Sequence, residues 1–202
     1  MDIQRELSAA ILVGRSTRMG RDKALLELNQ QTFIGHLAHE LSGCREVFAV
    51  ACVKRDYSDA GLEVLVDERQ NVGPMEGIRQ ALRHAATDLV FICAVDMPFF
   101  HREMAEYLAE RIAPGDDACV FRDGARVHPL CGIYRRTALP VIEQMLDADR
   151  RRMMELLSRL RTQYVDITSG GFAGESLSNI NTWEEYVKIT RDIRQEQAKQ
   201  HN

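Results

Sequence analysis

A short segment near the start of the sequence combines glycines with several cations. Residues 14–23 read Gly-Arg-Ser-Thr-Arg-Met-Gly-Arg-Asp-Lys and follow the apolar stretch 9–13. Glycine lets a backbone come close to a phosphate and present N–H donors to it. Arg18 and Lys23 add positive charge, the first as a planar fork and the second as a point charge. The segment indicates a cradle for a triphosphate, although a solvated basic surface loop would have the same composition.

The segment fits neither of two familiar phosphate-binding patterns. Gly14 and Gly20 lie six residues apart, and Lys23 comes three residues after Gly20, whereas the P-loop needs G-x4-G-K-[ST]. The dinucleotide pattern G-x-G-x-x-G does not occur either. The sequence therefore favours neither a P-loop ATPase nor a dehydrogenase.

A single carboxylate closes the most apolar segment of the chain. Asp96 follows seven apolar residues, 89–95, and Mg²⁺ on a phosphate substrate is usually held by only one or two carboxylates. Asp96 is thus a candidate Mg²⁺ ligand, with a turn-forming role before Met97-Pro98 as the alternative. Asp67 also follows an apolar pair. It is either an acceptor for a base or ribose or a plain loop residue.

A glycine-flanked turn and a pair of asparagines complete the candidate residues. Residues 73–77 read Gly-Pro-Met-Glu-Gly, and these glycines would let a flat ring pack against the backbone. The turn could equally be only a helix start, where proline is common. Asn179 and Asn181 share one face of an extended stretch and could line a site. Thr182 and Glu185 fit a capping box, which gives this stretch a structural role as well.

These residues need a scaffold that brings distant segments together. Apolar strand-like runs alternate with amphipathic helical patterns, which is typical of a mainly parallel sheet covered by helices. Strands are expected at about 9–13, 47–53, 62–66, 89–95, 118–121, 131–134 and 164–167. Helices are expected at about 32–44, 74–86, 101–112, 137–146 and 151–160, with a last one from 182 that frays into a polar tail at 191–202. Ligands of such sheets bind beyond the carboxyl ends of the strands.

Length and composition narrow the class of protein. The chain has 202 residues, 45% hydrophobic and 28% charged, which predicts a single domain over 1–202 with a sizeable core. Its net charge of −4 argues against a sequence-independent nucleic-acid binder. No apolar run approaches the ~20 residues that cross a bilayer, and the N-terminal residues lack the core of a signal peptide. Five scattered cysteines form no C-x-x-C pair. We therefore expect a cytoplasmic protein with reduced thiols and with neither nucleic-acid nor membrane partners.

Taken together, these segments resemble the molybdenum cofactor guanylyltransferase family. The family's loop, approximately L-A-G-G-x-S-x-R-M-G-x-D-K-A-L-L, resembles residues 12–26. Its G-P-L-x-G turn, acidic strand end, H-P-L and N-x-N-T-x-E-[ED] segments resemble 73–77, 96–98, 128–130 and 179–185. The matches keep their order from about residue 9 to 187, and R-M-G-x-D-K is the most specific of them. There are two departures. Val13 replaces the first glycine of the loop, or else the loop is one residue shorter, and Cys52 stands where the family has an asparagine.

The resemblance implies an α/β, three-layer Rossmann-like nucleotidyltransferase fold with a mostly parallel central sheet. It also implies that GMP passes from GTP to the terminal phosphate of molybdopterin or molybdenum-molybdopterin, with Mg²⁺ as cofactor and pyrophosphate as product. Transient contact with cofactor-delivery proteins would follow from that role. The alternatives are a cytidylyltransferase acting on the same cofactor, a sugar-phosphate nucleotidyltransferase, and a GTP-binding partner protein that has lost catalysis.

The resemblance, together with the residue patterns, also assigns roles to individual positions. The catalytic candidates are Lys23, Asp96 and Arg18, with Asp96 as the metal ligand. The nucleotide-binding candidates are Leu12, Gly14, Lys23, Asp67, Gly73, Gly77 and Asp96. Asn179 and Asn181 are expected on the pterin side.

Overall fold

The structure is a computed structural model that describes residues 2–15 and 22–200, and within them one sheet of seven strands forms the centre. The strands follow each other across the sheet in the order β5-β4-β1-β6-β8-β7-β9. Their bounds are β1 (Leu7–Val13), β4 (Val47–Ala51), β5 (Glu63–Val66), β6 (Leu89–Ala94), β7 (Ala118–Asp123), β8 (Arg126–Arg135) and β9 (Thr162–Asp166). Neighbouring strands are parallel except where β8 pairs with β6 and β7. The predicted mostly parallel sheet is confirmed.

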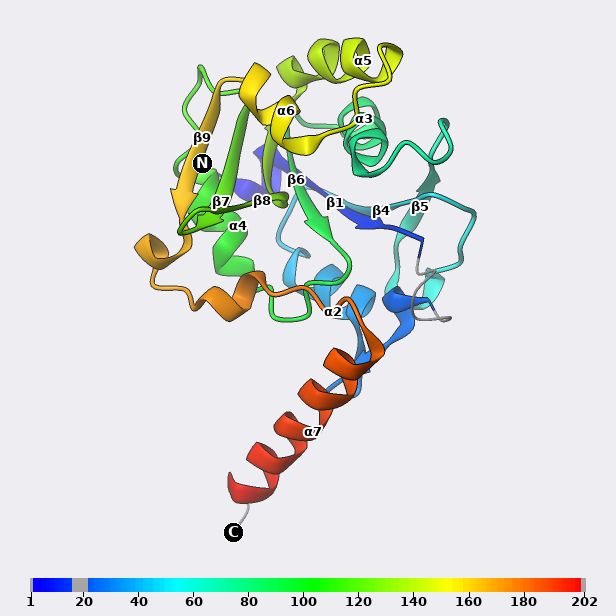
Figure 1. Cartoon of the computed structure of the whole chain (residues 1–202), viewed down its shortest axis with the longest axis vertical. Helices are drawn as coiled ribbons and strands as arrows, with labels where there is room; N and C mark the ends of the chain where they lie inside the picture. Colours follow the sequence, from blue (N-terminus) through cyan, green and yellow to red (C-terminus); the bar gives the residue numbers. More distant parts are fainter. Residues whose placement is uncertain (1, 16–21, 201–202) are drawn as a thin grey trace.

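Helices cover both faces of this sheet and make a three-layer arrangement (Figure 1). One face carries α2 (Phe33–Glu40) and α4 (Arg102–Ala109), and the other carries α3 (Pro74–His84), α5 (Leu139–Asp147) and α6 (Met153–Arg159). The central strand β6 shows why its sequence is apolar throughout. Phe91 packs into the core under α2 and α4, whereas Ile92 packs into the core under α3, α5 and α6. Alternate side chains of one strand thus serve both cores.

The predicted strands and helices all occur, with boundaries that differ by a few residues. Among the strands, the largest difference is in β8, which begins at Arg126 and not near residue 131. Its pairing with β7 shifts between Val120 and Phe121 and then continues to the turn. The turn itself is Gly124-Ala125, one residue later than the Asp123-Gly124 turn that the sequence indicates, because Asp123 still pairs with Arg126. Gly124 has a φ of 55°, which glycine adopts without strain.

Several short elements were not predicted from the sequence. They are α1 (Ile3–Glu6), the hairpin β2 (Glu27–Leu28) and β3 (Gln31–Thr32), and the 3₁₀ turns η1 (Lys23–Leu25), η2 (Ser58–Ala60), η3 (Arg136–Ala138), η4 (Ile167–Gly170) and η5 (Gly174–Leu177). The hairpin turns through Asn29 and Gln30, whose φ angles are 52° and 64°. Such turns usually carry Asn-Gly or Asp-Gly, whereas here the second residue is a glutamine, which is rare in this conformation. The usual sequence signal of the turn is therefore missing.

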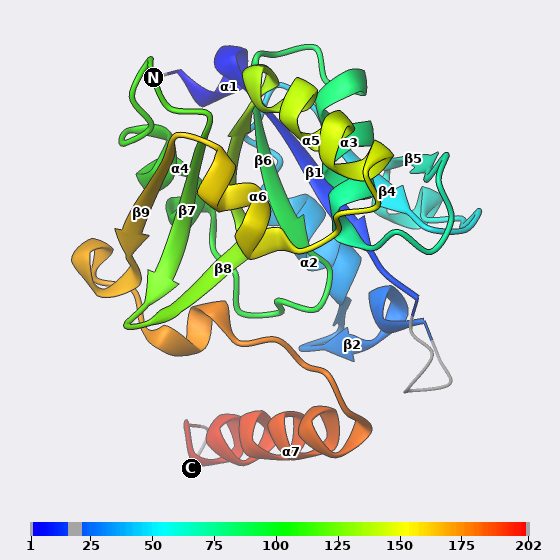
Figure 2. The same cartoon turned by 45° about the horizontal axis from the view of Figure 1, so that its top comes forward.

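The last helix, α7 (Trp183–Gln200), projects away from the sheet (Figures 1 and 2). Tyr186 and Ile189 on its first turns pack against a small cluster formed by Leu26, Phe33 and Ile180. The prediction that this helix frays from residue 191 is wrong, because it continues to residue 200. Its last ten residues contain neither glycine nor proline, and most of them are good helix formers. Among the described helices, none is long and apolar enough to cross a bilayer.

The predicted capping box does begin α7. The hydroxyl oxygen of Thr182 accepts a hydrogen bond from the backbone N–H of Glu185 at 3.2 Å. In return, the Glu185 carboxylate accepts from the backbone N–H of Thr182 at 3.1 Å. Two N–H groups that the helix itself leaves unpaired are thereby satisfied.

The pairing of β7 with β8 predicts a measurable cost for one substitution. A Cβ atom on Gly132 would lie 2.6 Å from Val120 Cγ1 and 2.8 Å from the backbone oxygen of Cys119. Overpacking of this kind costs about 1–3 kcal/mol, so Gly132→Ala should lower the urea midpoint of unfolding accordingly. Gly115→Ala is the matched control, because its Cβ would meet nothing closer than 3.9 Å. Equal midpoints for the two variants would contradict this view of the β7–β8 contact.

Candidate active site

A cavity of about 520 Å³ lies at the edge of the sheet where four parallel strands end. The residues Gly14, Cys52, Asp67 and Asp96 follow β1, β4, β5 and β6 respectively, and all four line the cavity. Taken in chain order, these strands run 3-2-1-4 across the sheet, so the direction of the crossovers reverses between β1 and β6. Sheets of this type bind ligands at that point.

Most of the residues singled out from the sequence meet in this cavity. Those that line it are Leu12, Gly14, Lys23, Asp67, Gly73, Gly77, Asp96 and Asn179. Asn181 is exposed and is not part of the lining. Its side-chain amide donates to the backbone oxygen of Asn179 at 3.5 Å. Arg18 lies outside the described residues.

Lys23 and Asp96 come together although 73 positions separate them. Lys23 Nζ lies 3.4 Å from Asp96 Oδ2, and the two side chains are only 15% and 18% exposed. The same Nζ donates to the backbone oxygen of Ile180 at 2.8 Å. The expected convergence of Lys23 with the end of β6 is therefore confirmed. A cation and a carboxylate that share a cavity wall are suited to a ligand carrying both phosphates and a metal ion.

The segment before α7 holds Asp96 from a second side. Asn179 Nδ2 donates to Asp96 Oδ1 at 3.0 Å, and the backbone N–H of Ile180 donates to the backbone oxygen of Asp96 at 2.9 Å. Burial raises the pKa of Asp96 above its usual range, and the Lys23 ammonium partly offsets this effect. The carboxylate is thus fixed in direction before any ligand arrives.

A short 3₁₀ turn presents Lys23 to the cavity. Asp22 caps this turn, because its side chain accepts from the backbone N–H of Ala24 at 3.1 Å. The other oxygen of Asp22 accepts from the Tyr57 hydroxyl at 2.9 Å and lies 3.3 Å from Arg55 Nε. The aspartate that precedes Lys23 is therefore an anchor, which explains why Asp and Lys are adjacent here.

Asp67 presents an unsatisfied acceptor. Its Oδ1 atom is buried, and no donor among the described residues reaches it. Burial, reinforced by the nearby Glu76 carboxylate and opposed by Arg79, raises the pKa of Asp67 to about 6. A buried acceptor without a partner costs free energy, so this atom is ready to accept a hydrogen bond from a ligand.

The glycines of the 73–77 turn line another part of the cavity wall. Gly73 has a φ of 84° at the start of α3, a conformation that glycine adopts readily. A Cβ on Gly77 would lie 3.1 Å from Leu12 Cδ2, so glycine lets α3 lie close over β1. The turn begins a helix, as one of its two interpretations predicted, and Gly73 and Gly77 line the cavity. Packing of a flat ring against these glycines stays a prediction.

Two further lining residues, Arg15 and Asn71, were not selected from the sequence. Arg15 belongs to the predicted cationic segment, and of the cations there only Arg18 and Lys23 were selected as candidates. Its guanidinium donates to the Gln70 side chain at 3.1 Å. Asn71 has a φ of 63°, which asparagine tolerates better than most residues. The sequence signal that could have selected Asn71 is its position just before Val72-Gly73-Pro74.

The residues present fit a Mg²⁺ ion. Asp96 supplies a carboxylate at the cavity wall, and oxygen donors of this kind are what Mg²⁺ prefers, with phosphate oxygens and waters completing its shell. An ionised carboxylate has about four lone-pair positions. Asn179 and Lys23 approach one oxygen each, so acceptor capacity remains on both.

The sheet, its helices and this cavity define a nucleotidyltransferase type of α/β enzyme. Residues 9–164 match the family model described as the MobA-like NTP transferase domain. The chain therefore belongs to this family and is a nucleotidyltransferase, and the resemblance noted from the sequence is confirmed.

Proteins of known or assigned role are similar over most of their length. The molybdenum cofactor guanylyltransferase of Vibrio parahaemolyticus is 30% identical over 179 residues, which cover 87% of this chain and 90% of that protein. A probable molybdenum cofactor guanylyltransferase of Carboxydothermus hydrogenoformans is 31% identical over 189 residues, 92% of this chain and 95% of that protein. The solved molybdopterin-guanine dinucleotide biosynthesis protein A of Archaeoglobus fulgidus superposes with a TM-score of 0.76 at 27% identity and covers 94% and 99% of the two chains.

Proposed function

We propose that this enzyme transfers GMP from GTP to the terminal phosphate of molybdopterin or molybdenum-molybdopterin, and so acts in molybdenum cofactor biosynthesis. A phosphate oxygen of the pterin attacks the α-phosphorus of GTP in line. The bond between the α-phosphorus and its bridging oxygen breaks, and pyrophosphate leaves with the electron pair. The observation that carries the proposal is the meeting of Lys23 and Asp96 in the cavity at the end of β1 and β6.

The residues act by positioning and by charge. An ionised phosphate is already a nucleophile, so the reaction needs no protein base. Lys23 would leave Asp96 and bind the β- and γ-phosphates, where it offsets the charge that grows on the leaving pyrophosphate. Arg18 would assist from the same loop. Asp96 would hold Mg²⁺, which when bound supplies charge stabilisation at the phosphate oxygens.

The remaining cavity residues would hold the nucleoside and the pterin. Leu12, Gly73 and Gly77 would pack along the guanine and ribose, with Gly14 close to the phosphates. Asp67 would accept hydrogen bonds from the nucleoside through its unsatisfied Oδ1. Asn179, which already orients Asp96, would lie between the reacting phosphates and the pterin, with Asn181 further out on that side.

Reconstitution with molybdopterin, GTP and Mg²⁺ tests the proposal. We expect stoichiometric pyrophosphate and a molybdopterin-guanine dinucleotide product. Turnover with CTP in place of GTP would instead identify a cytidylyltransferase, and turnover with sugar phosphates would identify a sugar-phosphate enzyme. Binding of GTP without pyrophosphate release would identify a partner protein that has lost catalysis.

The raised pKa of Asp67 predicts how GTP affinity depends on pH. The ionised carboxylate is the better acceptor, so affinity should rise as the pH passes upward through about 6. If the bound form stays ionised, GTP should bind about tenfold more weakly at pH 5 than at pH 7. Calorimetric dissociation constants of wild type and Asp67→Asn measure this.

Dividing the dissociation constant of Asp67→Asn by that of wild type removes the titration of GTP itself, because both proteins bind the same nucleotide. This ratio should grow between pH 5 and pH 7 and then level off. A ratio that stays constant over this range would count against Asp67 as an acceptor for GTP.

A further inference from the structure

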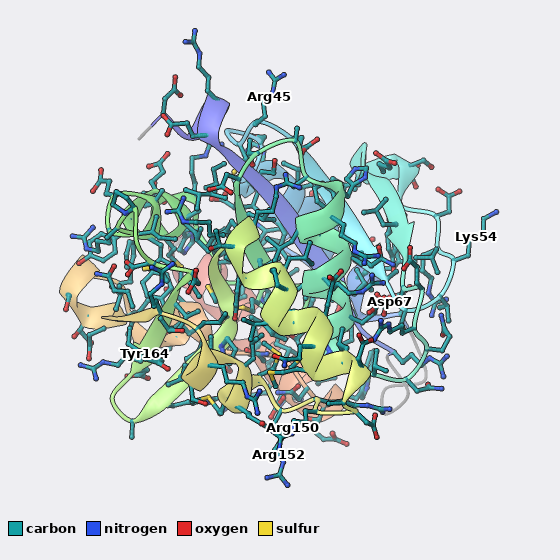
Figure 3. The ribbon with its side chains drawn as sticks, turned by 90° about the horizontal axis from the view of Figure 1, so that it is seen from above. Arg45, Lys54, Asp67, Arg150, Arg152 and Tyr164 are labelled. Atoms are coloured by element: carbon teal, nitrogen blue, oxygen red, sulfur yellow. The ribbon has the colours of Figure 1, made fainter. Side chains whose placement is uncertain are left out.

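The loop between β5 and α3 carries one wall of the cavity. It spans residues 67–73, of which Asp67, Asn71 and Gly73 line the cavity. Neither Asp67 nor Asn71 belongs to a helix or strand, so their positions depend on what holds the loop. Figure 3 shows Asp67 close to α3.

Two fully buried charges lie on α3 beneath this loop. Glu76 is 0% exposed and Arg79 is 1% exposed. Arg79 Nε donates to Glu76 Oε2 at 2.8 Å, and Arg79 Nη2 donates to Glu76 Oε1 at 2.6 Å. The pair is therefore bidentate, the strongest geometry for such an interaction.

Both members of the pair also bond to the residues that directly follow Asp67. Arg79 Nη2 donates to Glu68 Oε2 at 2.6 Å, and the backbone N–H of Arg69 donates to Glu76 Oε1 at 3.3 Å. The Glu76–Arg79 pair thus binds the loop through one side chain and one backbone group. These contacts fix the path of the chain immediately beyond Asp67, which lines the cavity.

Burying an ion pair costs free energy, because both charges lose their hydration. Apolar residues of similar volume often give equal or greater stability, whereas they cannot donate to or accept from a loop. The hydrogen bonds to residues 68 and 69 are what apolar side chains could not supply. This difference separates a positioning role from a packing role.

We propose that Glu76 and Arg79 are positioning residues that hold the 67–73 loop and so direct the unsatisfied Oδ1 of Asp67 towards the nucleoside of GTP. The inference rests on the proposed function in taking Asp67 as an acceptor for GTP. The inference attributes the correct placement of the nucleoside to Glu76 and Arg79, neither of which is among the residues that line the cavity.

The same loop is also tethered at the surface, which provides a matched control. Arg69 Nη2 donates to Asp147 Oδ1 at 2.8 Å, with side chains 37% and 68% exposed. Arg151 Nη1 donates to the backbone oxygen of Asn71 at 2.9 Å. Exposed pairs contribute little, so Asp147→Ala should leave GTP binding within twofold of wild type.

The test compares GTP with inorganic tripolyphosphate as ligands of the full-length protein. In the double variant Glu76→Leu/Arg79→Met, no buried charge is left unpaired. We expect its dissociation constant for GTP to rise at least tenfold, with the constant for tripolyphosphate and the thermal midpoint unchanged. Adding Asp67→Asn to this variant should cost no more than about twofold, whereas the same change in wild type should cost much more.

Two results would overturn the inference. One is wild-type affinity for GTP in the double variant together with full sensitivity to Asp67→Asn. The other is equal weakening for GTP and tripolyphosphate, which would indicate general damage to the cavity. If the double variant does not fold, Glu68→Ala removes one tether at a side chain that is 62% exposed. It should weaken GTP binding several-fold, and unchanged affinity would refute the positioning role.

Failure of the proposed function looks different. In that case wild type itself would make no dinucleotide, or Asp67→Asn would leave GTP binding in wild type unchanged. If only the inference fails, wild type still makes the dinucleotide, and Asp67→Asn still weakens GTP binding in the wild-type background.

Discussion

Replacement of Asp96 by Asn is expected to reduce kcat for pyrophosphate release at least ~100-fold, because it removes the charge proposed to hold Mg²⁺ at the reacting phosphates. Asparagine keeps the shape of the side chain and an oxygen that can accept from Asn179. The dissociation constant for GTP should change less than about tenfold, since Lys23 and Asp67 are retained. Initial rates at saturating GTP and molybdopterin, together with calorimetry, separate the two effects.

The thermal midpoint is the control for this variant. Burial raises the pKa of Asp96, which means that the charged form costs stability in the fold. Asp96→Asn should therefore fold normally, with a midpoint at or above that of wild type at neutral pH. Near-normal turnover in Mg²⁺ by this folded variant would reject the assigned role.

Replacement of Lys23 by Met should weaken GTP binding and lower kcat, each by about 10- to 100-fold. A hydrogen bond to a charged group contributes about 1.5–3 kcal/mol, and the charge on the leaving pyrophosphate would lose its partner. Methionine retains much of the apolar stem, so packing changes little. Calorimetry with GTP and with GMP, combined with steady-state rates, measures the two losses.

GMP is the informative control for Lys23, because it lacks the β- and γ-phosphates. Lys23→Met should bind GMP as wild type does if the lysine contacts only the triphosphate end. Lys23 also donates to Ile180, so a purely structural role would weaken both ligands alike. That pattern would contradict the phosphate contact.

The strands, and the meeting of Asp67 and Asp96 at the ends of two of them, could be predicted from the sequence. Apolar runs predicted the strands, and parallel strands end at the same edge of a sheet. Asp67 and Asp96, each placed after such a run, do meet at one cavity. Their catalytic and binding roles, and the single domain over 1–202, stay predictions.

Other features depend on three-dimensional neighbours and left little trace in the sequence. Charged residues are rarely fully buried unless they are paired, and no motif in the sequence marked Glu76 and Arg79 as a buried pair. The distance between Lys23 and Asp96 depends on the 3₁₀ turn after β1, which no apolar periodicity marks. The last helix was wrongly predicted to fray from residue 191, because the polar residues that follow carry no apolar periodicity although most of them are good helix formers.

The stretch from Asn179 to Asn181 lies late in the chain and contacts two residues of its first half. It lies beyond residue 164, where the family match stops, yet it bonds to both Asp96 and Lys23. A fragment trimmed to residues 9–164 would cut into β1 and β9 and would lose the contacts by which residues 179–180 hold Asp96 and Lys23. Dissection or grafting of this enzyme should therefore retain the late segment, since its contacts with the cavity residues lie outside the boundaries of the shared domain.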